Sequence, residues 1–204
     1  MRLTRCRSTR LLALAVGLVM TLALGSAARA SDEIPLDVAC DANTFVFQGP
    51  TSSAGPDYGA SFVVQGVIYP GGTFAANGPS SGLLADGTPE FPDLVVGRWT
   101  CQGHFIGDGI ATASGPFVVT MQLYDLDLDE PGADTLVSQG LELIDLNVPI
   151  RRAVTGGTGA FNAAGGDVTQ TSIGINATGL FNFTFLFDLD VRSPRGPRPP
   201  SSAH

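Results

Sequence analysis

Four polar side chains at alternate positions form the first group with chemical potential. They lie in a strand predicted over residues 94–106, where Arg98, Thr100, Gln102 and His104 share one face. Facing inward, this face would supply ligand-binding residues together with an aromatic residue of the next strand: Arg98, Gln102, His104 and Tyr124. His104 and Tyr124 are the catalytic candidates, because imidazole and phenol groups can exchange protons. Facing outward, the four side chains would merely be solvated.

A serine-hydrolase pattern, Gly-x-Ser-x-Gly, occurs at residues 78–82. Its serine would need a turn from strand to helix and a histidine partner. The surrounding sequence has neither, since the chain's histidines are His104 and the terminal His204. We therefore interpret the match as chance.

An acidic stretch, Asp-Leu-Asp-Leu-Asp-Glu at residues 125–130, has the spacing that opens a calcium loop. The sixth position is Glu130 where such a loop needs glycine, and the twelfth is Leu136 where it needs glutamate. We expect a solvated strand end, and we assign no metal ligands.

Two cysteines, Cys40 and Cys101, follow the N-terminal region. In an oxidising compartment the simplest expectation is a disulfide between them. The alternative is a pair of buried free thiols that pack as small apolar side chains. Two cysteines and one nearby histidine are too few for a structural zinc site.

The first 30 residues have the organisation of a secretory signal peptide. A basic segment precedes an apolar run over residues 11–24, and Ala-Arg-Ala ends at position 30. Cleavage would remove five arginines and no acidic residue, leaving six basic against nineteen acidic residues, a net charge of about −13. The signal peptide predicts a secreted protein. The acidic surface would repel phosphate backbones and anionic lipids, so we expect neither nucleic-acid nor membrane partners.

The remaining chain predicts an all-β fold. Alternating residues, separated by Gly- and Pro-rich turns, predict strands near residues 37–48, 58–69, 94–106, 116–127, 135–146, 149–155, 165–174 and 180–191. Eight strands suit a small closed barrel. We therefore expect one antiparallel barrel domain over residues 31–192 and a disordered Pro- and Arg-rich tail over residues 193–204.

Two further features of this domain leave alternatives open. Every second residue from Phe181 to Phe187 is phenylalanine, a row that must be either barrel interior or a buried subunit contact. The longest irregular segment, residues 77–93, is either a functional loop or a mobile surface excursion.

A glycine-rich segment at residues 152–168 carries a family resemblance. It reads Arg-Ala-Val-Thr-Gly-Gly-Thr-Gly-Ala-Phe and continues to Gly-Gly-Asp-Val, so Gly156, Gly157, Gly159 and Phe161 would form a structural turn. This segment resembles the signature turn of dirigent proteins and allene oxide cyclases. Residues 96–98 and 135–140 fall where those families carry similar stretches, and the likeness spans roughly residues 94–191.

The resemblance implies an eight-stranded antiparallel barrel, lipocalin-like in shape, with a lumen for a hydrophobic small molecule. It also implies a homo-oligomer, since plant members are often trimers. Dirigent proteins steer the coupling of phenoxy radicals, and allene oxide cyclases close a fatty-acid epoxide. The sequence departs from the dirigent pattern at Gly165, where an arginine is common, so neither reaction is assigned.

The expected function is therefore binding of a hydrophobic small molecule in the lumen, with a dirigent- or cyclase-like stereo-directing role. Any enzymatic activity would be that of an isomerase or cyclase that uses no cofactor. The alternative is a secreted structural or interaction barrel whose core is filled by its own side chains.

Overall fold

The computed structural model describes residues 32–190, which form a closed barrel of eight antiparallel strands. The barrel strands are β1 (Asp32–Gln48), β4 (Ser61–Pro70), β5 (Gly97–Phe105), β6 (Pro116–Asp125), β7 (Thr135–Leu143), β8 (Pro149–Gly157), β9 (Gly166–Ile175) and β10 (Phe181–Leu189). From β4 to β10 each strand pairs with its neighbour in sequence, and β1 lies between β4 and β10 and closes the cylinder. The predicted fold class and all eight predicted strands are confirmed.

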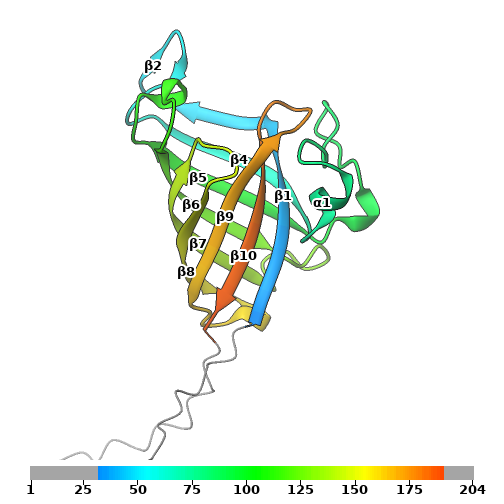
Figure 1. The fold of residues 1–204 in the computed structure, drawn as a ribbon. Helices are drawn as coiled ribbons and strands as arrows, with labels where there is room; N and C mark the ends of the chain where they lie inside the picture. Colours follow the sequence, from blue (N-terminus) through cyan, green and yellow to red (C-terminus); the bar gives the residue numbers. More distant parts are fainter. Residues whose placement is uncertain (1–31, 191–204) are drawn as a thin grey trace, which may run out of the picture.

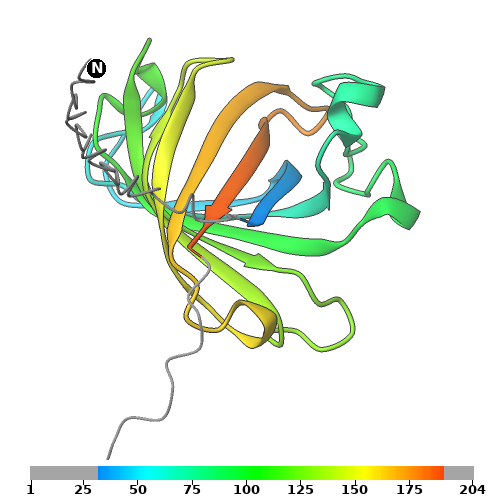
Figure 2. The same cartoon turned by 60° about the horizontal axis from the view of Figure 1, so that its bottom comes forward.

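Several short strands and helices lie outside the barrel wall or at its ends. A small hairpin of β2 (Thr51–Ser52) and β3 (Gly55–Pro56) stands at one end, and helix α1 (Thr73–Asn77) lies outside the wall (Figure 1). Three single-turn 3-10 helices cover Pro92–Leu94, Gly109–Ala111 and Gly159–Phe161. The first strand begins and the last strand ends at the opposite end from the hairpin, where Asp32 pairs with Leu189. Figure 2 shows the cylinder from that end.

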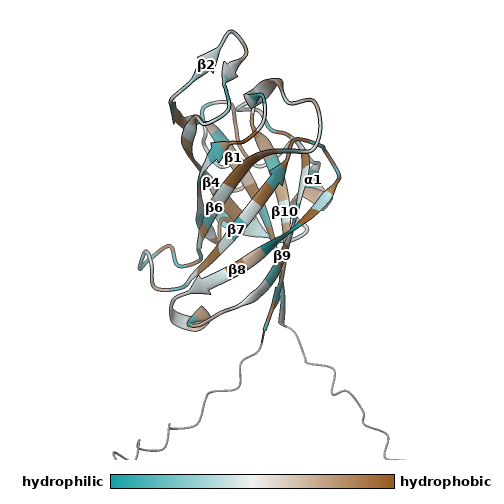
Figure 3. Cartoon of the chain, turned by 90° about the vertical axis from the view of Figure 1, so that its left-hand side faces the viewer, coloured by the Kyte–Doolittle hydropathy of each residue, from teal (hydrophilic) through white to brown (hydrophobic). Residues whose placement is uncertain are grey.

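Alternation along the strands divides the wall into an inner and an outer face, visible as alternating colours in Figure 3. The phenylalanine row of β10 projects into the barrel, where Phe183, Phe185 and Phe187 are buried. The row is therefore barrel interior and not a subunit contact. Trp99, Tyr124 and Leu136 reach the same core from the other side of the cylinder.

The glycine-rich segment forms the turn from β8 to β9. Gly159 has φ +54°, and a Cβ at this position would collide with the Asp134 carboxylate and the Ala133 carbonyl. Gly157 has no room for a Cβ either, because it lies against the Thr135 carbonyl. Phe161 follows and packs against the main core. Glycine is required here by backbone conformation and by close approach.

Residues 77–93 form a packed structure on the outside of the barrel. Leu83 and Phe74 are buried with Tyr69 and Ala39 in a second core cluster. The Tyr69 hydroxyl donates to the Gly82 carbonyl at 2.6 Å, and the Asn182 amide donates to the Pro79 carbonyl at 3.0 Å. The segment therefore covers the outer surface of β1, of β10 and of the end of β4 that carries Val67 and Tyr69, and it does not enter the lumen.

The predicted signal peptide and the predicted tail lie outside the described residues. Between residues 32 and 190, no helix has the length and the apolar character needed to cross a membrane.

Candidate functional site

The barrel interior has two halves of different character. The half nearest the chain ends is filled by side chains, with the Tyr124 ring packed edge-on against Phe185 and Phe187 at centroid distances of 5.1 and 4.9 Å. Leu136 and Val168 are fully buried in the same cluster. No ligand could enter this half without displacing the core.

Above this packed half lies a layer of buried polar side chains. Glu142 of β7 is at its centre: one carboxylate oxygen accepts from Thr120 at 2.6 Å and from Gln122 at 2.8 Å. The other oxygen accepts from Gln170 at 3.2 Å. Because these groups come from three strands, β6, β7 and β9, the layer is a product of the tertiary fold.

Arg152 of β8 supplies the opposing charge. Its guanidinium lies 3.7 Å from the Glu142 carboxylate, with no exposed side-chain surface. It also donates to the Leu141 carbonyl at 3.0 Å, the Thr120 carbonyl at 3.2 Å and the Ser138 hydroxyl at 3.3 Å. A buried charge pair is tolerated only when such additional hydrogen bonds satisfy it.

Beyond the polar layer, the lumen opens into an apolar cavity of about 330 Å³. This volume is at the lower end of the range of small-molecule sites. Its walls are mostly aromatic and aliphatic, and Glu142 is the charged side chain among them. The lining residues are Cys40, Ala42, Phe45, Phe62, Val64, Trp99, Cys101, Phe105, Phe117, Val118, Glu142, Ile144, Ile175, Gly179, Leu180, Phe181 and Phe183.

Two local features shape the mouth of this cavity. The pairing of β1 with β4 is interrupted between Asp41 and Val46, which brings Ala42 and Phe45 to the rim. The β9–β10 turn folds over the same edge, where the Asn176 amide donates to the Cys40 carbonyl at 2.8 Å and the Thr178 hydroxyl accepts from the Ala42 amide at 3.0 Å. Aromatic rings continue around the rim, with Phe45 and Phe62 at a centroid distance of 5.6 Å.

Two thiols and one phenol inside the barrel are held in their protonated forms. Burial raises the pKa of the Cys40 and Cys101 thiols well above the usual range, and the nearby Glu142 carboxylate raises both further. Burial likewise raises the pKa of the Tyr124 phenol. Neutral thiols are poor nucleophiles, so the cysteines act as packing residues of the cavity wall.

Three of the four predicted ligand-binding residues lie outside the lumen, which corrects the inward alternative. Arg98, Gln102 and His104 are exposed on the outer face of β5. The inner face of that strand carries Trp99, Cys101 and Phe105. The physical reason is burial: the large apolar set occupies the lumen and leaves the polar set in solvent.

Tyr124, the fourth predicted residue, does face inward but below the cavity. Its hydroxyl donates to the Gln122 side-chain oxygen and lies 3.4 Å from the Ser138 hydroxyl, and it is absent from the cavity lining. His104 and Tyr124 therefore lie on opposite faces of the wall and cannot act on one ligand. Glu142, Arg152 and Trp99 were not predicted as lumen residues from the sequence. The available signal was inner-face periodicity, which places Glu142 in line with Leu136 and Ser138.

The predicted disulfide is not formed, and both cysteines are free and buried. Strand β4 lies between the strands that carry them, since Cys40 pairs with Gly66 of β4 and Cys101 with Val64. Two strand spacings separate their backbones by about 9 Å, whereas a disulfide needs Cα atoms within about 7 Å. The alternative of two buried thiols is the one observed.

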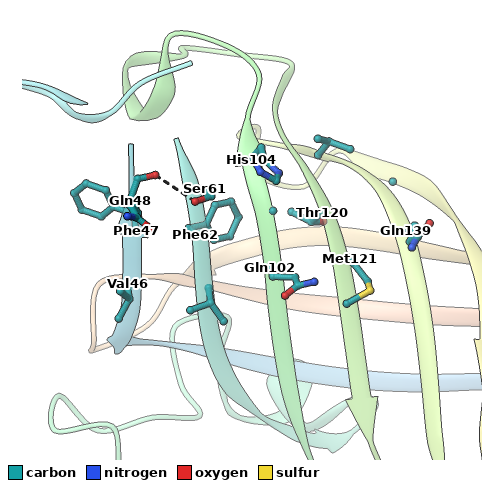
Figure 4. A pocket seen from close by; sticks show the side chains of 14 residues that line it. Val46, Phe47, Gln48, Ser61, Phe62, Gln102, His104, Thr120, Met121 and Gln139 are labelled. Atoms are coloured by element: carbon teal, nitrogen blue, oxygen red, sulfur yellow. Dashed lines mark hydrogen bonds between the residues drawn. The ribbon is translucent and has the colours of Figure 1, made fainter. Parts of the chain in front are cut away.

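A second, shallower hollow of about 670 Å³ lies on the outside of the barrel (Figure 4). Gln102, Met121 and Gln139 line it from neighbouring strands, with His104 above them and Val46 opposite. It is an open groove along the wall, without the enclosure of the lumen. Across residues 32–190, no three His, Cys, Asp or Glu side chains gather in a way that could hold a metal ion.

Comparison with known proteins identifies the fold. No protein-family model and no curated protein sequence matches the chain. Two solved dirigent proteins match in structure. The pterocarpan synthase GePTS1 has 13% sequence identity and a TM-score of 0.53, and the match covers 89% of this chain and 98% of GePTS1. The pterocarpan synthase PsPTS1 has 16% identity and a TM-score of 0.51, and the match covers 78% of this chain and 93% of PsPTS1.

A pyocyanin demethylase also matches, with 16% identity and TM-score 0.48 over 76% of this chain and all of the other. The two dirigent matches show that this chain has the barrel fold of dirigent proteins, so the predicted resemblance is confirmed at the level of fold.

Proposed function

We propose that this protein is a secreted barrel that binds a hydrophobic small molecule in the cavity at the open end of its lumen. The observation that carries the proposal is the cavity itself, about 330 Å³ of mostly aromatic wall above a polar floor. Apolar concave sites with a few placed polar groups are the usual form of a small-molecule site. Secretion rests on the organisation of the first 30 residues, together with the acidic surface.

The alternative, a structural protein with a filled barrel, agrees with one half of the lumen and not with the other. Tyr124, Phe185 and Phe187 occupy the end near the chain termini, as a filled barrel requires. The other half has open space where a filled barrel would place side chains. Aromatic and aliphatic residues surround this space, among them Phe45, Phe62, Phe105, Phe117, Ile144, Leu180, Phe181 and Phe183. Open space over a satisfied polar layer favours binding.

A stereo-directing role is the finer form of the proposal. It requires a wall that holds one ligand conformation, because confinement alone can favour one product of a reactive molecule. The dirigent-type fold and the protonated state of the lumen thiols support orientation over covalent catalysis. No cofactor is part of this proposal.

Binding can be tested with N-phenyl-1-naphthylamine, a neutral dye whose emission rises in apolar surroundings. We expect saturable binding to the mature protein. Ala42→Phe places a ring at the rim and should weaken the affinity at least about tenfold. Ala153→Phe makes the same chemical change at an exposed position of β8 and should bind like wild type. Equal binding by Ala42→Phe and Ala153→Phe, or no saturable binding to wild type, contradicts the proposal.

We also propose self-association through the outer face of β4, β5, β6 and β7. We call this face the uncharged wall, because its charged side chains are confined to one end. Two charged side chains lie on this face, Arg98 and Asp125, and they are cross-strand partners at one end. Val63, Val119 and Leu141 lie toward the other end of the face and are each about 40% exposed. Copies with a charge of about −13 repel one another elsewhere, so a second copy fits this face best.

The size of the uncharged wall is consistent with a stable interface. Four strands of about nine residues cover roughly 19 by 30 Å, close to the about 800 Å² per partner of a standard interface once side-chain relief is included. We expect an oligomer at micromolar concentration by light scattering. Val119→Glu should yield monomers, whereas Thr155→Glu, exposed on β8, should not. A wild-type monomer at about 100 µM overturns this proposal.

A further inference from the structure

The lumen cavity is lined by a continuous series of aromatic rings, which we call the aromatic girdle. Neighbouring rings have centroids 5.3–6.4 Å apart, and the series crosses the mouth from β6 to β10. In order, the girdle consists of Phe45, Phe62, Phe105, Phe117, Phe181, Phe183 and Trp99. Phe45, Phe62 and Phe117 are only half-buried, so a ligand in the cavity can contact their rings. Aromatic rings attract cations through their negative faces.

The charge on the cavity wall is negative. Glu142 belongs to the lining, whereas Arg152, its partner, lies in the polar layer outside the lining. Cys40 of β1 lies opposite Glu142 of β7, since three strands separate β1 from β7 in either direction around the barrel. Burial raises the pKa of the Cys40 thiol, and the Glu142 carboxylate raises it further from across the lumen. At Cys101, after burial, Glu142 raises the thiol pKa more than Arg152 lowers it. A ligand beside these thiols is therefore in a negative field without having to touch the carboxylate.

The loops at the mouth have the same sign of charge. They cover residues 49–60, 106–115, 144–148 and 176–180, at the end of the barrel that carries the β2–β3 hairpin (Figure 1). These loops contain no arginine or lysine and three aspartates: Asp57, Asp108 and Asp145. Asp145 directly follows Ile144 of the cavity lining. Charges of one sign around a mouth with apolar walls focus the field and raise the local concentration of the opposite charge.

The arginines of the domain lie away from the cavity. Residues 32–190 contain three arginines against nineteen Asp and Glu residues. Arg98 lies on the outer face near the filled end, Arg151 pairs with Asp167 on the outside, and Arg152 is buried in the polar layer. An anionic ligand would therefore be repelled both at the mouth and at the wall.

The apolar lining restricts which cations fit. A primary ammonium group has three N–H donors, and an apolar wall would leave most of them unpaired at a cost in free energy. A quaternary ammonium group has no N–H, and its alkyl groups pack against aromatic rings while its charge acts on the ring faces. The cavity of about 330 Å³ equals the liquid volume of about eleven water molecules, so it suits a ligand of about ten heavy atoms.

We infer that the lumen site binds a hydrophobic organic cation, a small quaternary ammonium compound held by the aromatic girdle in the field of Glu142 and the mouth aspartates. This inference rests on the proposed lumen binding and adds the charge and the chemical class of the ligand to it. The girdle and the acidic groups select the ligand and take part in no bond making or breaking.

Three probes of the same shape and different charge test the inference. Phenyltrimethylammonium, tert-butylbenzene and benzenesulfonate have the same ring, the same tetrahedral head and the same number of heavy atoms, with a positive, a neutral and a negative head. Their dissociation constants for the mature protein are measured by displacement of N-phenyl-1-naphthylamine. We expect the cation to bind at least as tightly as the hydrocarbon, although only the cation loses strong hydration on entry. The sulfonate should bind at least about a hundredfold more weakly than the cation.

The outcomes separate the inference from the proposal on which it rests. If the hydrocarbon binds more tightly than the cation, or the sulfonate binds as tightly as the cation, the inference is wrong and lumen binding stands. The same holds if the dye binds and none of the three probes displaces it. If the dye does not bind either, the lumen proposal and the inference both fail.

Two triple variants with the same net charge test the role of the mouth. The mouth variant is Asp57→Asn/Asp108→Asn/Asp145→Asn, and the control, in the β6–β7 loop at the filled end, is Asp127→Asn/Asp129→Asn/Asp134→Asn. Asparagine keeps an acceptor for the backbone N–H groups of Gly115 and Ala160, which donate to Asp145 and Asp134. Glu142 is left unchanged, because its loss would strand the buried Arg152 charge.

The mouth variant should bind phenyltrimethylammonium about tenfold more weakly than wild type and tert-butylbenzene equally well, whereas the control should bind both like wild type. Ala42→Phe should weaken binding of the cation as it weakens binding of the dye, which shows that the cation enters the lumen. Equal effects of the two triple variants on cation affinity, or full cation affinity in Ala42→Phe, overturn the inference.

Discussion

The buried pair of Glu142 and Arg152 makes the sharpest prediction about the lumen. Arg152→Leu removes the guanidinium 3.7 Å from the carboxylate, along with its hydrogen bonds to Ser138, Leu141 and Thr120. The Glu142 carboxylate, 5% exposed, is then left without its counter-charge. Breaking one partner of such a pair costs about 3–5 kcal/mol of folding free energy, a large share of the roughly 5–15 kcal/mol of a typical domain.

The neighbouring residue provides the control. Arg151 also pairs with a carboxylate, that of Asp167, but the two side chains are 69% and 45% exposed. Exposed pairs contribute little, so Arg151→Leu should stay within about 0.5 kcal/mol of wild type.

Urea unfolding at pH 7 measures both variants, with Trp99 fluorescence as the signal. At a slope of about 2 kcal/mol/M, the Arg152→Leu midpoint should fall by about 2 M. Adding Glu142→Gln removes the stranded charge, so the double variant should be more stable than the sum of the single changes predicts. A cost below about 1 kcal/mol for Arg152→Leu, or strictly additive effects, would show that Arg152 does not neutralise a buried Glu142 charge.

Further predictions concern the core, the turn, the thiols and the response to pH. Phe185→Ala should cost about 3–5 kcal/mol by calorimetry, because it leaves a hole in the filled half; a cost under 1 kcal/mol would mean that this half is loosely packed. Gly159→Ala should destabilise more than Gly132→Ala, since both have positive φ but only Gly159 has atoms in the way of a Cβ; equal costs would contradict the close approach. Thiol titration of the mature protein without reductant should find no reactive cysteine when folded and both when unfolded, whereas none after unfolding would indicate a disulfide. Folding raises the pKa values of Cys40, Cys101 and Tyr124, so their contribution to the free energy of unfolding is complete below the unfolded pKa values and decreases as pH rises above about 9. The double variant Cys40→Ala/Cys101→Ala should lose less stability over this pH range. An unchanged dependence of the unfolding free energy on pH would contradict the raised thiol pKa values.

The fold could be predicted from sequence because strand alternation and glycine turns are local signals. All eight barrel strands were identified, and closure followed from their number. The face of β5 could not be chosen in this way. Both of its faces carry large side chains, and only the closed cylinder shows that Trp99, Cys101 and Phe105 occupy the interior.

The polar layer of the lumen was not predicted, for a related reason. Charged side chains are expected outside, so Glu142 and Arg152 gave no inward signal of their own. Their burial depends on partners from β6 and β9, Gln122 and Gln170, which no local pattern brings together. Likewise, residues 77–93 look mobile in sequence, yet Leu83 is buried on the outside of the wall.

Native mass spectrometry of the protein purified from its own host shows whether the open half of the lumen holds a small molecule. We predict a bound small molecule on wild type and on Ala153→Phe, and none on Ala42→Phe. Wild-type protein that carries no ligand in the same preparation, or a ligand that Ala42→Phe retains equally, would show that the lumen cavity is not a binding site.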